Sequence, residues 1–247
     1  MTPKKRYSYK IEAQHIDFRK KVSLTSLTNF ILLTSGKNAD ENGFGIMDLL
    51  ANNFTWVLSR LVIEMDRIPT EDDTISIQTW VEDVGTAFTT RSFKIYDAQD
   101  EIIGHASSSW AVMDMKTRRG VPLSALPSIN NYIENETTPI GEPQRIPATE
   151  DDISNIANSF TVRYSKIDVN NHANSLFYVQ WISDCFSLDH YRAHKIRRFE
   201  INFLKELTID DKGKVYRQET SPGDYYFSII TRDKGTACRA RILFEKN

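Results

Sequence analysis

Two stretches of the chain repeat the same order of hydrophobic and polar positions. Each begins with an Ile-Asp pair, continues through a polar segment and enters a run whose apolar residues recur at helical spacing. In residues 16–31 the apolar positions Leu24, Leu27 and Ile31 share one face. In residues 167–182 and just beyond, the corresponding positions are Phe177 or Tyr178, Trp181 or Ile182, and Cys185. This pattern predicts one amphipathic helix in each half.

Runs rich in β-branched and aromatic residues follow each predicted helix and are separated by turn residues. The runs of the first half are 54–67, 74–84, 88–97 and 101–114, those of the second half are 197–207, 213–220, 224–232 and 236–245, and one more run precedes each helix at 6–14 and 159–165. A single helix with consecutive strands and short turns predicts an α+β fold, in which each helix packs on an antiparallel sheet.

The prolines divide the chain. Five of its eight prolines lie between residues 122 and 147, where neither a helical nor a strand period is present. Such a composition is typical of a linker or an ordered crossing between folded units. The sequence therefore predicts an N-terminal domain at 1–120, a Pro-rich linker at 121–150 and a C-terminal domain at 151–247.

The charge and composition of the chain bear on whether it binds nucleic acid, a membrane or a metal ion. With 31 basic and 33 acidic residues the net charge is −2, which favours neither nucleic acid nor an anionic membrane. No apolar run approaches the ~18 residues of a membrane span, so we expect a cytoplasmic protein without a nucleic-acid or membrane partner. Cys185 and Cys238 predict buried reduced thiols. His190 and His194 are too few for a zinc site, so no metal is expected.

The densest polar cluster is Asp168-Val169-Asn170-Asn171-His172, at the point where the second half enters its predicted helix. Backbone N–H groups and the positive end of the helix dipole meet at such a junction, and they stabilise a carbonyl oxygen that gains negative charge. The cluster is therefore suited to acyl transfer. The alternative is that Asp and Asn only cap the helix and form an Asx-turn, with His172 on the surface.

The segment RYSKIDVNNHANSLFYVQWI resembles one in the acyl-[acyl carrier protein] thioesterases of plastids and bacteria, where an Asp-x-Asn-x-His loop enters an Asn-x-x-x-Tyr-x-x-Trp helix. The matching residues are Asp168, Asn170, His172, Asn174, Tyr178 and Trp181. EINFLKEL is similar to the strand that carries the family's glutamate, here Glu206, and the separation from His172 is 206 − 172 = 34 positions. WVLSRLVIEMDRIP, TWVED and Trp110 to Arg119 extend the resemblance over most of the chain.

The resemblance implies a tandem hotdog fold and release of fatty acids from acyl carrier protein without a cofactor. Glu206 is then the general base that activates water, while Asn170 and His172 orient the water or the thioester, Asp168 holds the loop and the helix N-terminus stabilises the oxyanion. Direct attack by the carboxylate stays open as a second route. The chain departs from the family at Leu207, where a cysteine is frequent, so a thiol nucleophile is excluded there.

The first half has Arg19 and Lys21 at the positions that align with Asn170 and His172. This difference predicts a single active site, in the second half. The resemblance implies that the first half shapes the acyl pocket, and the candidate lining residues are Trp56, Leu58, Leu61, Ile63 and Met65. The alternative for each of these residues is ordinary core packing.

The expected partner is acyl carrier protein with its fatty acyl chain, and basic clusters such as Lys195 to Arg198 are candidates for docking it. Two other functions remain open: a hotdog hydratase or dehydratase acting on acyl thioesters, and a non-catalytic acyl-thioester binding module. Chain length, saturation and the choice between acyl carrier protein and coenzyme A are not readable from the sequence. The oligomeric state is open between a monomer and a homodimer.

Overall fold

The computed structural model describes residues 3–149 and 153–247. The chain forms two compact units, Met1–Pro143 and Gln144–Asn247. The predicted boundary between residues 150 and 151 lies outside the described residues. Leu123 and Ile129, in the stretch that we expected as a linker, are buried in a core cluster of the first unit. Part of this Pro-rich stretch therefore packs as domain core.

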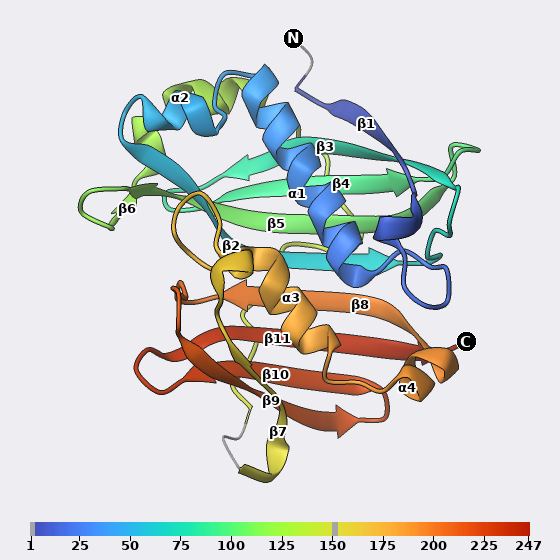
Figure 1. The fold of residues 1–247 in the computed structure, drawn as a ribbon. Helices are drawn as coiled ribbons and strands as arrows, with labels where there is room; N and C mark the ends of the chain where they lie inside the picture. Colours follow the sequence, from blue (N-terminus) through green and yellow to red (C-terminus); the bar gives the residue numbers. More distant parts are fainter. Residues whose placement is uncertain (1–2, 150–152) are drawn as a thin grey trace. The chain divides into compact units, whose positions relative to one another are not determined.

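The first unit is an antiparallel sheet with a long helix on it, and its strand order is β1-β3-β4-β5-β2, with β6 paired to β5. The strands are β1 Lys5–Lys10, β2 Phe54–Met65, β3 Thr74–Val84, β4 Thr89–Tyr96, β5 Ile102–Asp114 and β6 Gly120–Val121. The helices are α1 Leu24–Glu41 and α2 Ile46–Leu50, with 3-10 turns at Ala13–His15, Leu123–Ala125 and Pro127–Tyr132. In Figure 1, α1 lies across β3, β4 and β5.

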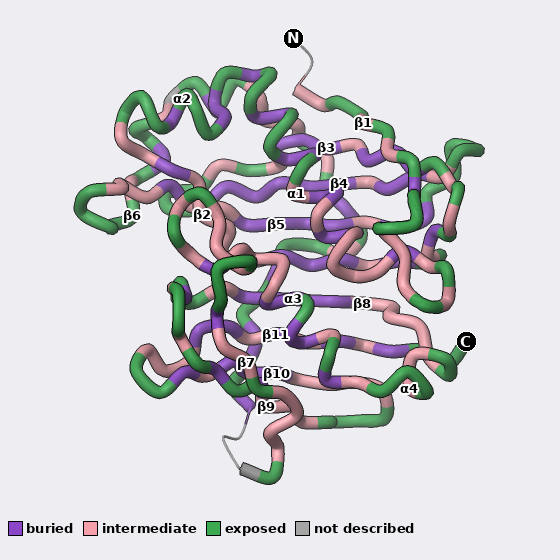
Figure 2. Tube along the Cα trace, in the orientation of Figure 1, coloured by how far each residue is buried: buried purple, intermediate pink, exposed green. Residues whose placement is uncertain are grey.

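Helix α1 begins where Ser23 caps it, because the Ser23 hydroxyl accepts a hydrogen bond from the N–H of Ser26 at 3.1 Å. Its buried face includes Leu27, Phe30 and Ile31, which contact the sheet side of the unit. Figure 2 shows buried positions along β3, β4 and β5 beneath this helix. The apolar face predicted at Leu27 and Ile31 is confirmed, and Leu24 is only partly buried.

The second unit repeats this arrangement with the strand order β8-β11-β10-β9-β7, all neighbours being antiparallel. The strands are β7 Ile156–Thr161, β8 His194–Phe203, β9 Lys212–Ser221, β10 Asp224–Thr231 and β11 Gly235–Lys246. The helices are α3 Ser175–Ser183 and α4 Leu188–Ala193, with 3-10 turns at Ile153–Asn155 and Tyr164–Lys166. Helix α3 lies across β8 and β11 in Figure 1.

The turn that leads into the long helix has the same construction in both units. Asp17 N donates to Lys21 O at 2.8 Å, and Asp168 N donates to His172 O at 2.8 Å. Lys20 and Asn171 occupy the equivalent left-handed position, with φ of 59° and 63°. The predicted internal repeat is therefore present in the backbone, down to the hydrogen bonds that close each turn.

The α+β prediction is confirmed, since each helix packs on an antiparallel sheet. One detail of the prediction is wrong: the expected strand at 197–207 stops early, because β8 ends at Phe203 and leaves Glu206 in a loop. The cause is local, since Leu204 N and Lys205 N both donate to the single carbonyl of Ala237, at 2.9 and 3.1 Å. A shared acceptor breaks the regular ladder.

The core of the second unit includes a stacked pair of rings between β7 and α3. The centroids of Phe160 and Trp181 lie 3.6 Å apart with an interplanar angle of 8°. Phe160 also covers Gly213 of the neighbouring strand β9, where it faces Gly213 in register. A side chain at Gly213 would overlap the Phe160 ring, and the stack on Trp181 restricts how far that ring can move.

We therefore expect Gly213→Ala to lower the free energy of unfolding by about 1–3 kcal/mol through overpacking against Phe160. Thermal or denaturant unfolding measures this change. Gly120→Ala is the matched control, because a Cβ at Gly120 meets no atom within 4 Å. Equal stability of the two variants would contradict this account of the core.

Candidate active site

The loop from Asp168 to His172 is shaped by one carboxylate. Asp168 Oδ1 accepts hydrogen bonds from the backbone N–H groups of Asn170 at 2.8 Å and His172 at 3.3 Å. Asn174 then caps α3, accepting from Leu176 N at 2.9 Å. The predicted Asx-turn and helix cap are thus present, and they fix the backbone of His172 at the start of the helix.

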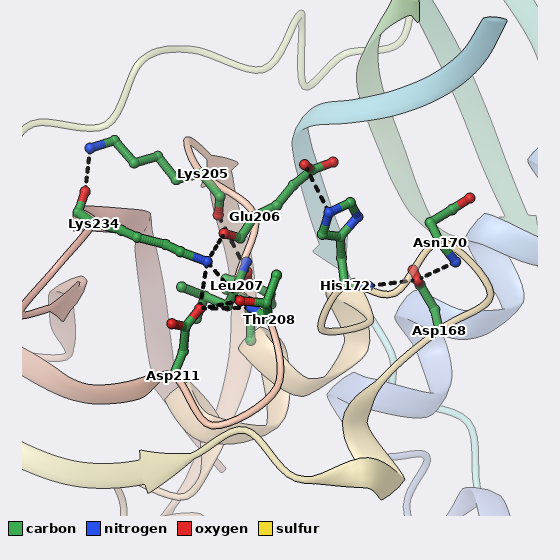
Figure 3. Close-up of polar contacts among 10 residues, drawn as sticks. Asp168, Asn170, His172, Lys205, Glu206, Leu207, Thr208, Asp211 and Lys234 are labelled. Atoms are coloured by element: carbon green, nitrogen blue, oxygen red, sulfur yellow. Dashed lines mark hydrogen bonds and ion pairs between the residues drawn. The ribbon is translucent and has the colours of Figure 1, made fainter. Parts of the chain in front are cut away.

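His172 meets Glu206 across this loop. His172 Nε2 lies 3.3 Å from Glu206 Oε2, and the two side chains are 22% and 39% exposed (Figure 3). At this separation a protonated imidazole forms an ion pair with the carboxylate. The two loops are also joined through the backbone, because Ala173 N donates to Leu207 O at 2.7 Å. The structure therefore brings together an imidazole and a carboxylate that are both accessible to a substrate.

A partly exposed ion pair between Lys234 and Asp211 supports the Glu206 loop. Lys234 Nζ donates to Glu206 O at 3.2 Å, to Thr208 Oγ1 at 3.0 Å and to Asp211 Oδ2 at 2.6 Å (Figure 3). Although burial of Asp211 works to raise its pKa, the hydrogen bonds from Lys234 and Thr208 hold that pKa below the ordinary value. One ammonium group thus ties the carbonyl of Glu206 to the far end of the loop.

Tyr178 holds the same loop from the helix side. Its hydroxyl accepts from Leu207 N at 3.1 Å and donates to Lys205 O at 3.3 Å. Burial raises the pKa of Tyr178, so the hydroxyl remains protonated and can serve as donor and acceptor at once. Residues on both sides of Glu206 are therefore fixed, while its side chain extends toward His172.

The backbone at the mouth of α3 is already engaged inside the protein. The N–H groups of residues 170 to 174 all donate to protein oxygens, and so do those of Leu176 and Phe177. The helix N-terminus that we expected to stabilise an oxyanion therefore has few N–H groups to offer. The side-chain amide of Asn170 takes part in none of these backbone bonds and is a candidate donor for that task.

The first unit has the same frame without the reactive groups. Asp17 holds Arg19, whose Nη2 lies 2.6 Å from Asp17 Oδ2, and Lys21 stands where the second unit has His172. Thr70 N donates to Asp73 Oδ2 at 2.8 Å, as Thr208 N does to Asp211 Oδ2 at 2.7 Å. Two positions before each threonine are Ile68 and Glu206. Ile68 of the first unit therefore occupies the position of Glu206 in the second unit. The sequence pattern alone did not show this correspondence.

The first unit contains a cavity of about 260 Å³ between α1, α2 and the sheet. Small residues of α1, namely Ser35, Gly36 and Ala39, form one wall, and Trp56 is part of another. Of the five residues predicted to line an acyl pocket, Trp56 alone lines this cavity. The others lie elsewhere: Leu61, Ile63 and Met65 are core residues, and Leu58 is partly buried.

Sequence reasoning also missed Arg91 in the wall of this cavity. Its guanidinium is buried and donates to Asn38 Oδ1 at 2.7 Å and to Thr79 Oγ1 at 3.3 Å. Burial lowers the pKa of Arg91 to about 10, so the group stays charged near neutral pH. The hydrophobic pattern of residues 88–97 predicts a strand, but it does not show that the Arg91 side chain is buried.

Neither cysteine is placed for nucleophilic work. Cys185 and Cys238 are free and buried, as expected, and burial raises the pKa of Cys185 to about 12. Within residues 3–149 and 153–247, no group of three or more His, Cys, Asp or Glu side chains is arranged to hold a metal ion. None of the helices in these ranges is long and apolar enough to cross a membrane.

The repeated units, each with an antiparallel sheet around one long helix, define a double-hotdog protein in which one helix mouth carries an imidazole and a carboxylate. The chain belongs to the acyl-ACP thioesterase family. The family's model of the N-terminal domain matches residues 3–132, and its model of the C-terminal domain matches residues 149–246.

Solved structures and sequence relatives agree with this placement. An acyl-ACP thioesterase from Bacteroides thetaiotaomicron shares 35% identity over 98% of both chains, with a TM-score of 0.92. The 12:0-ACP thioesterase of Umbellularia californica has the same fold at 20% identity, with a TM-score of 0.88 over 100% of this chain and 99% of that one. A chloroplastic acyl-[acyl-carrier-protein] hydrolase of Cuphea viscosissima is 28% identical over 83% of this chain. The chain spans about half the length of this relative, 52%.

The Lys234 contacts predict a measurable role in holding Glu206. In Lys234→Met the Asp211 carboxylate loses its cation, so we expect about 1.5–3 kcal/mol less stability and a lower kcat with little change in KM. Lys205→Met is the matched control, because Lys205 is exposed and its ammonium group donates to the Lys234 carbonyl, not to Glu206 or Asp211. A Lys234→Met protein with the stability and kcat of the control would refute this role.

Proposed function

We propose that this protein hydrolyses the thioester bond of fatty acyl-acyl carrier protein and releases the free fatty acid. The observation that carries the proposal is the contact between His172 Nε2 and Glu206 Oε2, at 3.3 Å, in the unit that also holds Asn170. Membership of the acyl-ACP thioesterase family supports the choice of substrate. The equivalent positions of the first unit hold Arg19, Lys21 and Ile68, which offer no such pair.

In the proposed reaction Glu206 acts as the general base. It takes a proton from water while the water oxygen attacks the thioester carbonyl carbon, and collapse of the tetrahedral intermediate expels the thiolate, which then gains a proton. His172 donates from Nε2 to the Glu206 carboxylate and keeps it oriented. Thiolates are good leaving groups, so a carboxylate base suffices without a nucleophilic cysteine.

In this proposal Asn170 stabilises the carbonyl oxygen of the thioester, and Asp168 fixes the conformation of the loop. The Asn170 amide donates to the developing oxyanion, since the neighbouring backbone N–H groups are already engaged. Asp168 holds the loop through its bonds to the backbone of Asn170 and His172. If Glu206 attacked the carbonyl directly, the thiolate would leave and a mixed anhydride between Glu206 and the fatty acid would form. Labelled water that attacks this anhydride at the Glu206 carbonyl carbon would place its oxygen in the Glu206 side chain, an outcome that the general-base route excludes.

The first unit is proposed to bind the acyl chain in its cavity of about 260 Å³. This cavity replaces the lining that we expected along β2, with Trp56 in common. The cytoplasmic location, the lack of nucleic-acid and membrane partners, and the oligomeric state stay predictions. Chromatography of the purified protein with light scattering measures the oligomeric state.

The defining experiment is a thiol-release assay with saturated acyl groups of increasing length on acyl carrier protein and on coenzyme A. A thioesterase releases thiol from saturated substrates. A hydratase consumes an enoyl thioester without releasing thiol, and a binding module retains the ligand without turnover. Absence of thiol release from every substrate would refute the proposed activity.

Glu206→Gln tests the proposed base directly. We expect kcat to fall by about 10²-fold or more, because glutamine keeps the shape but accepts no proton from water. Asp210→Asn is the matched control in the same loop, since Asp210 is exposed and pairs with Arg163 on the surface. A folded Glu206→Gln protein with full hydrolysis would remove Glu206 from the mechanism.

Gly36 offers a test of the acyl cavity. It lines the cavity in α1, and a Cβ at this position meets no atom within 4 Å. We expect Gly36→Leu to fill the cavity and to lower kcat/KM for the longest substrates by about 10-fold or more, while short substrates are spared. The helix should tolerate the change, because glycine is a poor helix former.

Gly36→Ala is the control for the change in helix propensity and should shift the profile less. An unchanged chain-length profile in a folded Gly36→Leu protein would show that the acyl chain binds elsewhere.

A further inference from the structure

The second unit has a groove of about 650 Å³ where β7 and β9 meet the turn between β10 and β11. Its wall includes Phe160, Thr161, Tyr216 and three basic residues, Lys212, Lys214 and Arg232. None of the described residues that line the groove is acidic. The groove therefore combines an aromatic and apolar surface with charge of a single sign.

The three cations have no carboxylate partner among residues 3–149 and 153–247. Lys212, Lys214 and Arg232 are exposed, and they form no ion pair with the residues that the structure describes. Within the described residues, the positive charge of the three side chains is therefore not balanced by a paired carboxylate. An uncompensated cluster of one sign attracts a partner of opposite charge over several ångströms of solution.

The basic cluster Lys195 to Arg198, which the sequence indicated as a candidate for docking, differs from the groove because its cations form ion pairs. Lys195 and Arg197 both pair with Glu245, at 3.4 and 3.6 Å. Arg198 pairs with Glu200 at 2.8 Å. These three cations each have a carboxylate partner within the unit, which makes them weaker candidates for docking an acidic partner than the groove cations.

The strand geometry explains why the groove residues act together. Lys212, Lys214 and Tyr216 alternate along β9, so their side chains lie on one face of the sheet. Ile230 of β10 pairs with Lys214 and adds an apolar position to that face. Aromatic and apolar residues beside exposed cations are typical of protein interfaces that recognise an acidic partner.

The groove adjoins the two loops of the candidate active site. Lys212 directly follows the loop 206–211, and that loop pairs with Val162, whose N–H donates to Asp211 O at 2.9 Å. Arg232 lies two positions before Lys234, which donates to Glu206 O at 3.2 Å. A partner seated in the groove would therefore lie beside the turns that hold Glu206.

We propose that this groove docks the folded, acidic body of acyl carrier protein, so that the thioester on its flexible arm reaches Glu206. The inference rests on the proposed function and adds the surface through which the substrate is recognised. Docking would act mainly on encounter and on KM, because the cations lie outside the group that attacks the thioester.

The test compares two variants. The groove variant carries Lys212→Glu, Lys214→Glu and Arg232→Glu together, and the control variant carries Lys195→Glu and Arg197→Glu. For the groove variant we expect KM for acyl-acyl carrier protein to rise by about tenfold or more, with kcat and its KM for acyl-pantetheine unchanged. The control should change little. Raising the ionic strength should weaken the wild-type reaction and leave that of the groove variant nearly constant.

A neutral variant, Lys212→Gln with Lys214→Gln and Arg232→Gln, keeps the test decisive if charge reversal prevents folding. An unchanged KM for acyl-acyl carrier protein, or an equal rise in the control, would overturn the proposal. An equal rise in KM for acyl-pantetheine would also overturn it, since that substrate has no protein body.

Titration of carrier protein without an acyl group separates the two proposals. Binding that is lost in the groove variant supports the docking surface, even if the wild-type protein releases no thiol and the proposed activity fails. Equal binding by wild type and groove variant overturns the docking surface, whatever the hydrolysis assay shows.

Discussion

The candidate site depends on one carboxylate that accepts two backbone hydrogen bonds. Asp168 binds the N–H groups of Asn170 and His172, which closes the turn and places Asn171 in the left-handed region. Without that turn the imidazole would have no fixed position relative to the helix. The pairing of His172 with Glu206 then requires only that the second loop be held, and Tyr178 and Lys234 hold it from two sides.

The two units share the turn that leads into the long helix and the loop that faces it, but they differ in the side chains that these segments carry. Both units close the same turn with an aspartate and brace the opposite loop with a threonine and aspartate pair. Only the second unit places an amide, an imidazole and a carboxylate on that frame. The first unit instead leaves space beside α1, where the small side chains of Ser35 and Ala39 and the bare Gly36 create a cavity. The candidate catalytic groups and the candidate acyl cavity thus lie in different units.

Much of the architecture was predictable from the sequence, because alternation and helical spacing report which faces are buried. The strand at 74–84 and the helix face at Leu27 and Ile31 illustrate this. The end of β8 was not predictable, since it follows from a carbonyl at Ala237 that two N–H groups share. The cavity lining was missed for a similar reason: a strand pattern does not show which neighbours leave room. The Lys234 contact joins residues 28 positions apart, and no local pattern reports such a pair.

The apolar residue at position 68 has a consequence for how the fold can be altered. Because the first unit already has the closed turn and the threonine–aspartate contact, Arg19, Lys21 and Ile68 mark three positions where it lacks the polar groups of the second unit. Three substitutions, to Asn, His and Glu, would install a second reactive trio on an existing scaffold. A domain that has this turn without the reactive groups is a template for designing a second site.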